Sequence, residues 1–354
     1  MTITHPAATR LLSLDVLRGI TIAFMILVNN NGNEAAAYWP LKHAAWNGFT
    51  PTDLVFPTFL FLVGISIVFS TGSRLVRGAT RQTLFFHVLR RSILLYLLGL
   101  VVNSFPYFHL HTMRFYGVLP RIAICYFLVA SLYLIAPGWR DKVALSIVAL
   151  AGYWVLMRFV PVPGYGVPGR DVPLLDHDAN LTAWLDRQIF SASHLYEHTR
   201  DPEGLLSTLP AIATTLIGML TGMWLRTERA ISDKIKGIFV AGFGCVLVGG
   251  LWNFTFPINK KLWTSSYVLF AAGFSLLLLA VCLVLADRRK SADKSRFLAP
   301  WVVFGTNAIA AYVFSELLQS TLNSIPVRQG MNLQRWIYLS IQHVVPNLAF
   351  ASLL

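Results

Sequence analysis

The chain has 354 residues, of which 55% are hydrophobic and 13% are charged, and its net charge is +13. Soluble domains carry roughly a quarter charged residues, so a chain with about half that share and long apolar runs is typical of a polytopic membrane protein. The positive charge does not indicate nucleic-acid binding, because the basic residues gather between alternate hydrophobic segments, as membrane topology requires.

Apolar runs near the length of a membrane-spanning helix recur along the whole chain. We predict about ten such helices, which form one all-α transmembrane bundle and a single domain over residues 1–354. Their approximate ranges are 12–30, 52–71, 87–103, 117–136, 142–160, 205–225, 235–253, 263–286, 299–320 and 337–354. The last range reaches the end of the sequence, so we expect either a short terminal helix or a span truncated at the C-terminus.

Basic residues mark one side of the predicted membrane. They concentrate in alternate loops, for example Arg74, Arg77 and Arg81 after the second span and Arg226 and Arg229 after the sixth. By the positive-inside rule these loops and the N-terminus are cytoplasmic. The segment between the first two spans and the long loop 161–204 then face outward, to the periplasm if the protein is bacterial or to a lumen if it is eukaryotic. A loop of that length in a compact bundle is usually functional or a cap.

The most polar stretch at a predicted membrane surface lies between the first two spans and contains His43. The polar and aromatic residues around it are Asn29, Trp39, Trp46, Asn47 and Asp53. Polar groups at membrane depth are costly and need partners. A histidine beside amides and a carboxylate is a candidate acid–base centre. The alternative is a loop histidine that only bonds to its neighbours.

Two further patterns leave alternatives open. Arg114 and Arg121 flank the predicted start of the fourth span, where an arginine needs an anion, either an acidic side chain or a ligand phosphate. His194 and His198 are four residues apart, but no HExxH motif accompanies them, so loop histidines are favoured over a metal site. We predict no metal site.

Several motifs occur in a fixed order between about residue 11 and residue 320. They are Ser13-Leu14-Asp15-Val16-Leu17-Arg18-Gly19, Lys42-His43-Ala44-Ala45-Trp46-Asn47-Gly48, Asp53-Leu54-Val55-Phe56-Pro57, Asp201-Pro202-Glu203-Gly204, Asn259-Lys260-Lys261-Leu262-Trp263 and Gly305-Thr306-Asn307. In these motifs the chain closely resembles the transmembrane acyltransferases related to lysosomal heparan-alpha-glucosaminide N-acetyltransferase.

The resemblance implies acetyl transfer across a membrane. Cytosolic acetyl-CoA is the donor, and the acceptor is an amino sugar on the far side: the terminal glucosamine of heparan sulfate in the animal enzyme, and a periplasmic glucosamine-type sugar or glycan fragment here. The animal enzyme's long N-terminal luminal region has no counterpart in this sequence, so we expect a bacterial member in the inner membrane. The animal relative is dimeric, which favours a homodimer.

The resemblance also assigns site residues. The active-site histidine falls on His43, its neighbouring asparagine on Asn29 and the motif aspartate on Asp53. His43 is then a general base or, alternatively, an acyl carrier. Candidates for binding the donor are Arg18, Arg114, Arg121, Lys261 and Asn307. Candidates for binding the acceptor are Trp39, Trp46, Asn47, Asp201 and Glu203. To bring the donor to His43, we expect a central channel open to the cytoplasm.

Other functions fit parts of the same pattern. Asn-rich helix ends and the prolines Pro57, Pro120 and Pro210 also suit the solute pathway of a transporter. A surface-glycan O-acyltransferase would need the same donor and a hydroxyl acceptor. A non-catalytic membrane partner in glycan assembly is a third alternative.

Overall fold

The computed structural model describes residues 11–136, 138–288, 294–327, 330–345 and 347–353, and their regular structure is helical apart from isolated β-bridges. The α-helices are α1 (Leu12–Asn29), α2 (Val55–Val76), α3 (Arg81–Ser104), α4 (Val118–Ile135), α5 (Trp139–Phe159), α6 (Leu181–Ile189), α7 (Thr208–Leu225), α8 (Ile231–Trp252), α9 (Ser265–Cys282), α10 (Lys294–Thr306), α11 (Ala308–Ser324), α12 (Leu333–Val344) and α13 (Leu348–Leu353). Short helical turns η1 (Trp39–Leu41), η2 (Pro51–Leu54), η3 (Leu110–Thr112) and η4 (Ala192–His194) lie between them, and a π-helical turn, η5 (Leu283–Arg288), extends α9.

The predicted all-α polytopic bundle is confirmed, with slightly fewer long apolar helices in the described residues than the ten or so that we predicted. Within the described ranges, eight helices are long and apolar enough to cross a membrane, and a ninth is added if α10 and α11 together form one broken span. The predicted span 299–320 is a helix pair bent by 78°. The predicted span 337–354 is occupied by two short helices, α12 and α13.

The backbone at Asn307 and a proline in the sequence account for the two differences. Asn307 separates α10 from α11 with backbone angles of φ −112° and ψ 23°, outside the helical range. Helix α12 ends at Val344, and the sequence continues with Val345 and Pro346. The residue before a proline is disfavoured in the α region, so an apolar stretch of sufficient length is interrupted there.

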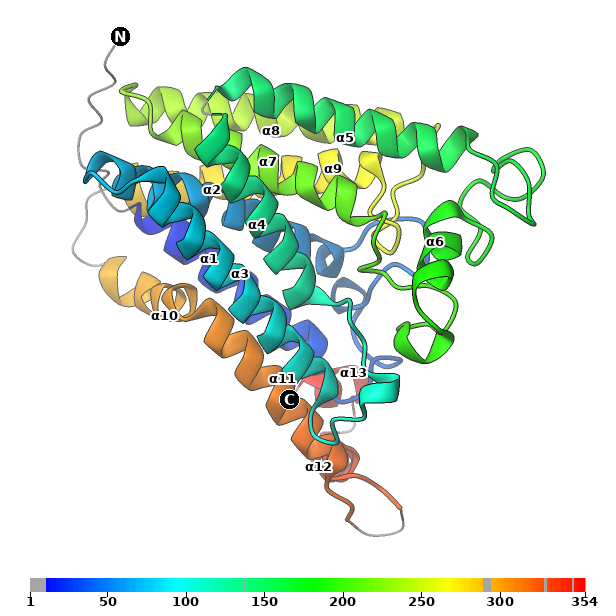
Figure 1. The fold of residues 1–354 in the computed structure, drawn as a ribbon. Coiled ribbons are helices and arrows are strands. Elements are labelled where there is room, and N and C mark those ends of the chain that lie inside the picture. The colour runs from blue at the N-terminus through cyan, green and yellow to red at the C-terminus, as the bar shows by residue number, and fades with distance from the viewer. Residues whose placement is uncertain (1–10, 137, 289–293, 328–329, 346, 354) are drawn as a thin grey trace.

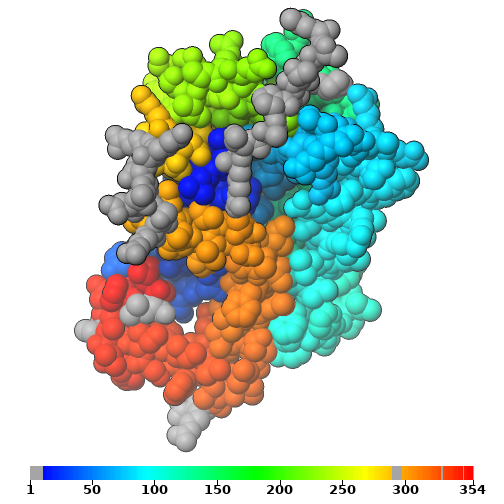
Figure 2. All heavy atoms as spheres, turned by 90° about the vertical axis from the view of Figure 1, so that its left-hand side faces the viewer, coloured from blue at the N-terminus to red at the C-terminus, as the bar shows by residue number. Residues whose placement is uncertain are grey.

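The long helices run side by side, and the loops that join them lie at two ends of the bundle (Figure 1). One end carries residues 30–54, 105–117, 160–207 and 253–264, together with α6 on the right of Figure 1, and we call it the His43 end. Figure 2 looks onto the opposite end, where the start of α1 (blue) lies between the α7–α8 region (green) and α10 (orange). The α2 and α7 helices are the most buried spans, whereas α3 and α8 face mostly outward.

Glycines allow α2 and α7 to approach each other closely. A Cβ atom on Gly64 would lie 2.0 Å from the carbonyl oxygen of Thr215, and one on Gly218 would lie 1.9 Å from that of Phe61. Small residues at such crossings are the usual means of close packing between membrane helices. The two central helices are therefore in backbone contact.

Gly218→Ala should destabilise the bundle, because the added methyl group meets backbone rather than a movable side chain. Overpacking of this kind costs about 1–3 kcal/mol. The thermal midpoint of the protein purified in detergent measures the effect. The matched control is Gly244→Ala on α8, where a Cβ atom has open space and the midpoint should be unchanged or slightly higher. Equal midpoints for the two variants would contradict the close approach.

Candidate active site

His43 and Asp53 form a hydrogen-bonded pair at the His43 end. His43 lies between η1 and η2, and Asp53 is the third residue of η2, which leads into α2. His43 Nδ1 is 2.7 Å from Asp53 Oδ1. The imidazole side chain is 39% exposed, whereas the carboxyl side chain is 1% exposed. The pair thus presents an accessible base that a buried carboxylate holds in place.

The rest of the Asp53 carboxylate is also satisfied. Its Oδ2 accepts hydrogen bonds from Ala44 N at 3.1 Å and from Thr50 N and Oγ1, both at 3.0 Å. The Thr50–Asp53 contacts form a capping box at the start of η2. A carboxylate only accepts hydrogen bonds, so His43 Nδ1 must carry the proton of its bond to Oδ1. The neutral imidazole then keeps its lone pair on Nε2, as a general base requires.

A lysine that the sequence did not single out contacts this pair. Lys260, in the loop between α8 and α9, places Nζ 3.0 Å from His43 Nδ1, 3.2 Å from Nε2 and 3.9 Å from Asp53 Oδ1. Burial lowers the pKa of Lys260, while the negative charges of Asp53 and Glu203 oppose that shift. We predicted its neighbour Lys261 instead, because nothing in the sequence distinguishes the two adjacent lysines.

A second cluster joins residues that we predicted for different ligands. Arg114 binds Asp201 through Nε at 2.7 Å and Nη2 at 2.6 Å, and Nη2 also donates to Glu203. Its guanidinium lies 4.7 Å from the Tyr196 ring centroid. Burial works against the charge of Arg114, but Asp201 and Glu203 raise its pKa. Asp201 is 1% exposed, so its carboxylate is committed to Arg114 rather than open to a ligand.

Arg121, in the first turn of α4, is fully buried beneath this cluster. Its Nη2 donates to the Gly204 carbonyl at 3.1 Å and to Ser207 Oγ, and its guanidinium lies 5.1 Å from the Trp263 ring centroid. Its Nε and Nη1 have no hydrogen-bond partner among the described residues. Arg121 therefore ties the start of α7 to α4 and the Trp263 loop.

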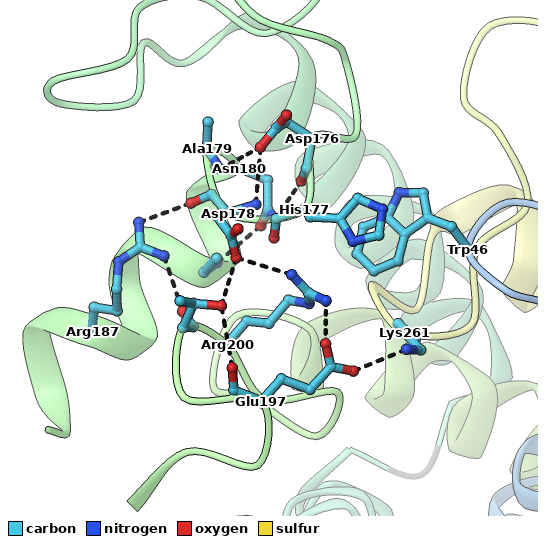
Figure 3. Close-up of polar contacts among 12 residues, drawn as sticks. Trp46, Asp176, His177, Asp178, Ala179, Asn180, Arg187, Glu197, Arg200 and Lys261 are labelled. Atoms are coloured by element: carbon cyan, nitrogen blue, oxygen red, sulfur yellow. Dashed lines mark hydrogen bonds and ion pairs between the residues drawn. The ribbon is translucent and has the colours of Figure 1, made fainter. Parts of the chain in front are cut away.

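Trp46 and Lys261 belong to a third cluster, drawn in Figure 3. The Trp46 ring stacks on His177 at a centroid distance of 3.8 Å, and the Arg200 guanidinium lies 4.9 Å from it. Lys261 Nζ donates to Glu197 at 2.9 Å, and Glu197 in turn binds Arg200. These contacts fasten loop 161–204 to residues 30–54, which we call the His43 segment. Within that loop α6 covers Leu181–Ile189.

Asn29 bonds to α11 instead of to His43. Its Nδ2 donates to Glu316 Oε1 at 2.9 Å, where the last turn of α1 meets α11. Glu316 is the one charged residue of α11, and carboxyl groups in membrane segments usually mark functional sites. That signal was present in the sequence and we did not use it.

Arg18 and Asn307 line one cleft of about 390 Å³ between α1, α2, α3, α4 and the break between α10 and α11. Arg18 donates to Asp15 at 3.1 Å, to the Gly305 carbonyl at 3.2 Å and to Ser66 Oγ at 2.9 Å. The cleft also receives Arg91, whose guanidinium lies 5.1 Å from the Tyr126 ring centroid. It therefore brings two predicted donor-binding residues together with a second cation.

The remaining predicted residues have different environments. Asn47 Oδ1 accepts a hydrogen bond from Asn259 Nδ2 at 3.1 Å, and Gly48 N donates to the Ile258 carbonyl at 2.8 Å. These bonds hold the Lys260 loop against the His43 segment. Trp39, on η1, is 66% exposed and keeps an open aromatic face.

Asp186 on α6 is a buried acid near the second cluster. Its Oδ1 accepts from Leu205 N at 3.1 Å, and its Oδ2 has no partner among the described residues. Burial raises the pKa of Asp186 to about 7, against the Leu205 hydrogen bond and with help from the charge of Asp201. The folded state thus favours the neutral carboxyl of Asp186. The contribution of this group to the free energy of unfolding is present below about pH 4 and is lost as the pH rises to about 7.

Asp186→Asn should remove this pH dependence, because the amide copies the shape of the neutral acid. We expect its thermal midpoint to exceed that of the wild type by several degrees at about pH 8 and to match it at about pH 4. Thermal unfolding in detergent at the two pH values measures the difference. A midpoint difference that does not change with pH would contradict a protonated Asp186.

Comparison with known proteins identifies relatives of this chain. A sequence profile of the family described as heparan-alpha-glucosaminide N-acetyltransferase, catalytic, matches residues 10–249. The proteins of that name from Mus musculus and Homo sapiens are 30% identical over 370 residues and 31% identical over 366 residues. The alignments cover 89% and 88% of this chain, but 54% and 53% of the relatives. The chain therefore spans about half the length of these proteins.

Proposed function

This chain belongs to the family defined by the catalytic region of heparan-alpha-glucosaminide N-acetyltransferase, and on that premise we propose that it transfers acetyl from acetyl-CoA to the amine of a glucosamine-type sugar. The observation that carries the proposal is the His43–Asp53 pair. Asp53 Oδ1 lies 2.7 Å from His43 Nδ1, so Nε2 remains free to act as the base. The imidazole is accessible, whereas the carboxylate that holds it is buried. A positioned base of this kind can take the proton from an amine that attacks an acyl donor.

A thioester is already an activated acyl donor, so direct transfer within a ternary complex needs no covalent relay. The amine nitrogen attacks the thioester carbonyl carbon, and His43 Nε2 takes a proton from that nitrogen. The carbon–nitrogen bond forms, the carbon–sulfur bond breaks, and the sulfur takes the electron pair and the proton. The products are the acetamide and free CoA. An acetyl-histidine intermediate is the alternative.

The cleft lined by Arg18 and Asn307 is the proposed donor site. Its volume of about 390 Å³ is in the range of small-molecule sites. Arg18 and Arg91 supply positive charge for the anionic donor, and the walls from α2 and α4 are largely apolar. The predicted passage from the cytoplasm to His43 would pass through this cleft.

Arg18→Gln should raise the KM for acetyl-CoA by about tenfold and leave the KM for the acceptor sugar unchanged, because one charge-assisted contact to the donor is lost. Initial rates measured while each substrate is varied in turn check this expectation. An unchanged KM for acetyl-CoA in a folded variant would remove Arg18 from the donor site.

Glu203 and Trp39 are the proposed acceptor groups. Glu203 is bonded to Arg114 through Oε2, and its negative charge acts on Lys260, which contacts His43. It would bind the sugar amine or hydroxyls. Trp39 offers its exposed ring as a platform for the sugar. Asp201 supports Glu203 by holding Arg114.

The proposed topology follows the charge pattern. Arg74, Arg77 and Arg226 lie toward the end opposite His43, so we infer that this end and the N-terminus are cytoplasmic. His43 then faces the periplasm of a bacterium, in the inner membrane. We infer a homodimer from the family resemblance alone.

The test is an assay of purified protein in detergent with acetyl-CoA and glucosamine. The proposal predicts equal amounts of free CoA and N-acetylglucosamine. N-acetylglucosamine offered as acceptor should give no turnover, since it has only hydroxyl groups left. Turnover with that sugar would favour the O-acyltransferase alternative, and sugar binding without CoA release would favour a transporter.

A further inference from the structure

Lys260 lies directly against the imidazole of His43, the proposed base. It is nearly equidistant from the two ring nitrogens of His43, at 3.0 and 3.2 Å. Nδ1 already donates to Asp53, so Nε2 is the one ring nitrogen that can accept from the ammonium. An ammonium at nearly equal distances from both nitrogens lies over the face of the ring. It therefore stands beside the in-plane lone pair of Nε2, to which an acceptor amine must deliver its proton.

The position of Lys260 is fixed by its loop. Asn259 Oδ1 accepts from Leu262 N at 2.9 Å, and Asn259 N donates to Thr264 Oγ1 at 3.0 Å. Asn259 Nδ2 reaches across to Asn47 at 3.1 Å, and Tyr267 Oη donates to the Asp53 carbonyl at 2.7 Å. These bonds tie the lysine loop and α9 to both sides of the His43 segment. A catalytic group needs positioning of this kind.

Lys260 is not needed to satisfy Asp53. Three donors from Ala44 and Thr50 and one from His43 already occupy that carboxylate. The distance from Nζ to Oδ1 is 3.9 Å, which is an ion pair but too long for a hydrogen bond. Among the described residues the hydrogen bonds of Nζ go to His43 alone, and an ammonium has three donors. Donors thus remain for a substrate oxygen.

We propose that Lys260 is the electrophilic group of the transfer, donating a hydrogen bond to the thioester carbonyl oxygen while His43 takes the amine proton. The inference rests on the proposed acetyl transfer. As the amine attacks, the carbonyl electron pair moves onto oxygen, where the ammonium stabilises the charge. The pair then returns, the carbon–sulfur bond breaks, and the sulfur leaves with the electron pair and receives the proton from His43. Lys260 keeps its own proton throughout.

The ammonium works only while it is protonated. Its neighbours are His43, the carboxylates of Asp53 and Glu203, and the cation Lys261, and burial lowers the pKa of Lys260 below the ordinary lysine value of 10.5. The rate should therefore fall on the alkaline side at a pH below that value. A guanidinium at the same position keeps its charge and should move this fall to higher pH.

Three variants test the inference: Lys260→Gln, Lys260→Arg and, as the matched control, Lys42→Gln. Lys42 is the residue next to His43, but its ammonium donates to the Ala35 carbonyl at 2.6 Å. We expect Lys260→Gln to lower kcat by about 10²–10³-fold with little change in either KM. Lys260→Arg should recover part of the loss and shift the alkaline limb upward, and Lys42→Gln should keep the wild-type kcat.

The outcomes separate this inference from the proposed function. An active wild type whose kcat survives Lys260→Gln would overturn the role of Lys260 and leave the transfer standing. An inactive wild type would overturn both. If Lys260→Gln does not fold, the Lys260→Arg pH profile still decides, since a purely structural lysine would leave the alkaline limb of kcat where it is in the wild type.

Discussion

Asp53→Asn is expected to lower kcat by about 10³–10⁴-fold with the fold intact, a loss comparable to that seen when a catalytic histidine is held in the wrong tautomer. The amide oxygen should stay with the donors of Ala44 and Thr50 that now surround Oδ2. The amide NH₂ must then face His43 Nδ1, which becomes the acceptor. The ring proton moves to Nε2, and the base loses the lone pair that the reaction needs.

Steady-state rates of labelled acetyl transfer measure this loss, with thermal midpoints of both proteins as the control for folding. The KM for acetyl-CoA should change little, because Asp53 is 0% exposed and does not reach a substrate. A folded Asp53→Asn variant with a kcat within about tenfold of the wild type would contradict the tautomer argument.

His43→Ala should lower kcat by roughly 10²–10⁴-fold, the usual contribution of a positioned general base. The side chain is 39% exposed, so its removal creates little strain and the variant should fold. Free imidazole added to the assay should restore part of the rate to this variant and none to the wild type. A folded His43→Ala variant with wild-type kcat would remove His43 from the chemistry.

The same preparation separates direct transfer from an acyl-enzyme. Wild-type protein is incubated with labelled acetyl-CoA and no acceptor, then denatured and freed of small molecules. Direct transfer predicts no label on the protein. Label that is retained by the wild type and absent from His43→Ala would instead establish acetyl-histidine as the route.

The fold was predictable where hydropathy and length agree. The first eight predicted spans correspond to eight of the long helices, with ends that differ by a few residues. The prediction failed after residue 294, because hydropathy does not register a bend. The sequence 299–320 is apolar enough to span, yet the chain turns by 78° at Asn307. Nothing in the apolar pattern of 337–354 predicts the end of α12, whereas a proline at position 346 of the sequence does.

The site was predictable where its residues are close in the sequence. His43 and Asp53 are ten residues apart, and their pairing was anticipated. Lys260 is more than two hundred residues away and reaches His43 through the Asn47–Asn259 bond, which no local pattern encodes. For the same reason the sequence could not tell that Arg114 is bound to Asp201 and Glu203.

Proteoliposomes provide the most direct test of the proposed transfer. Purified protein is reconstituted in one orientation, with labelled acetyl-CoA on the side of Arg74 and Arg77 and glucosamine on the side of His43. We predict N-acetylglucosamine on the His43 side and an equal amount of free CoA on the other, and neither product with Asp53→Asn. Glucosamine that crosses the membrane unmodified, without release of CoA, would contradict the account and identify a transporter.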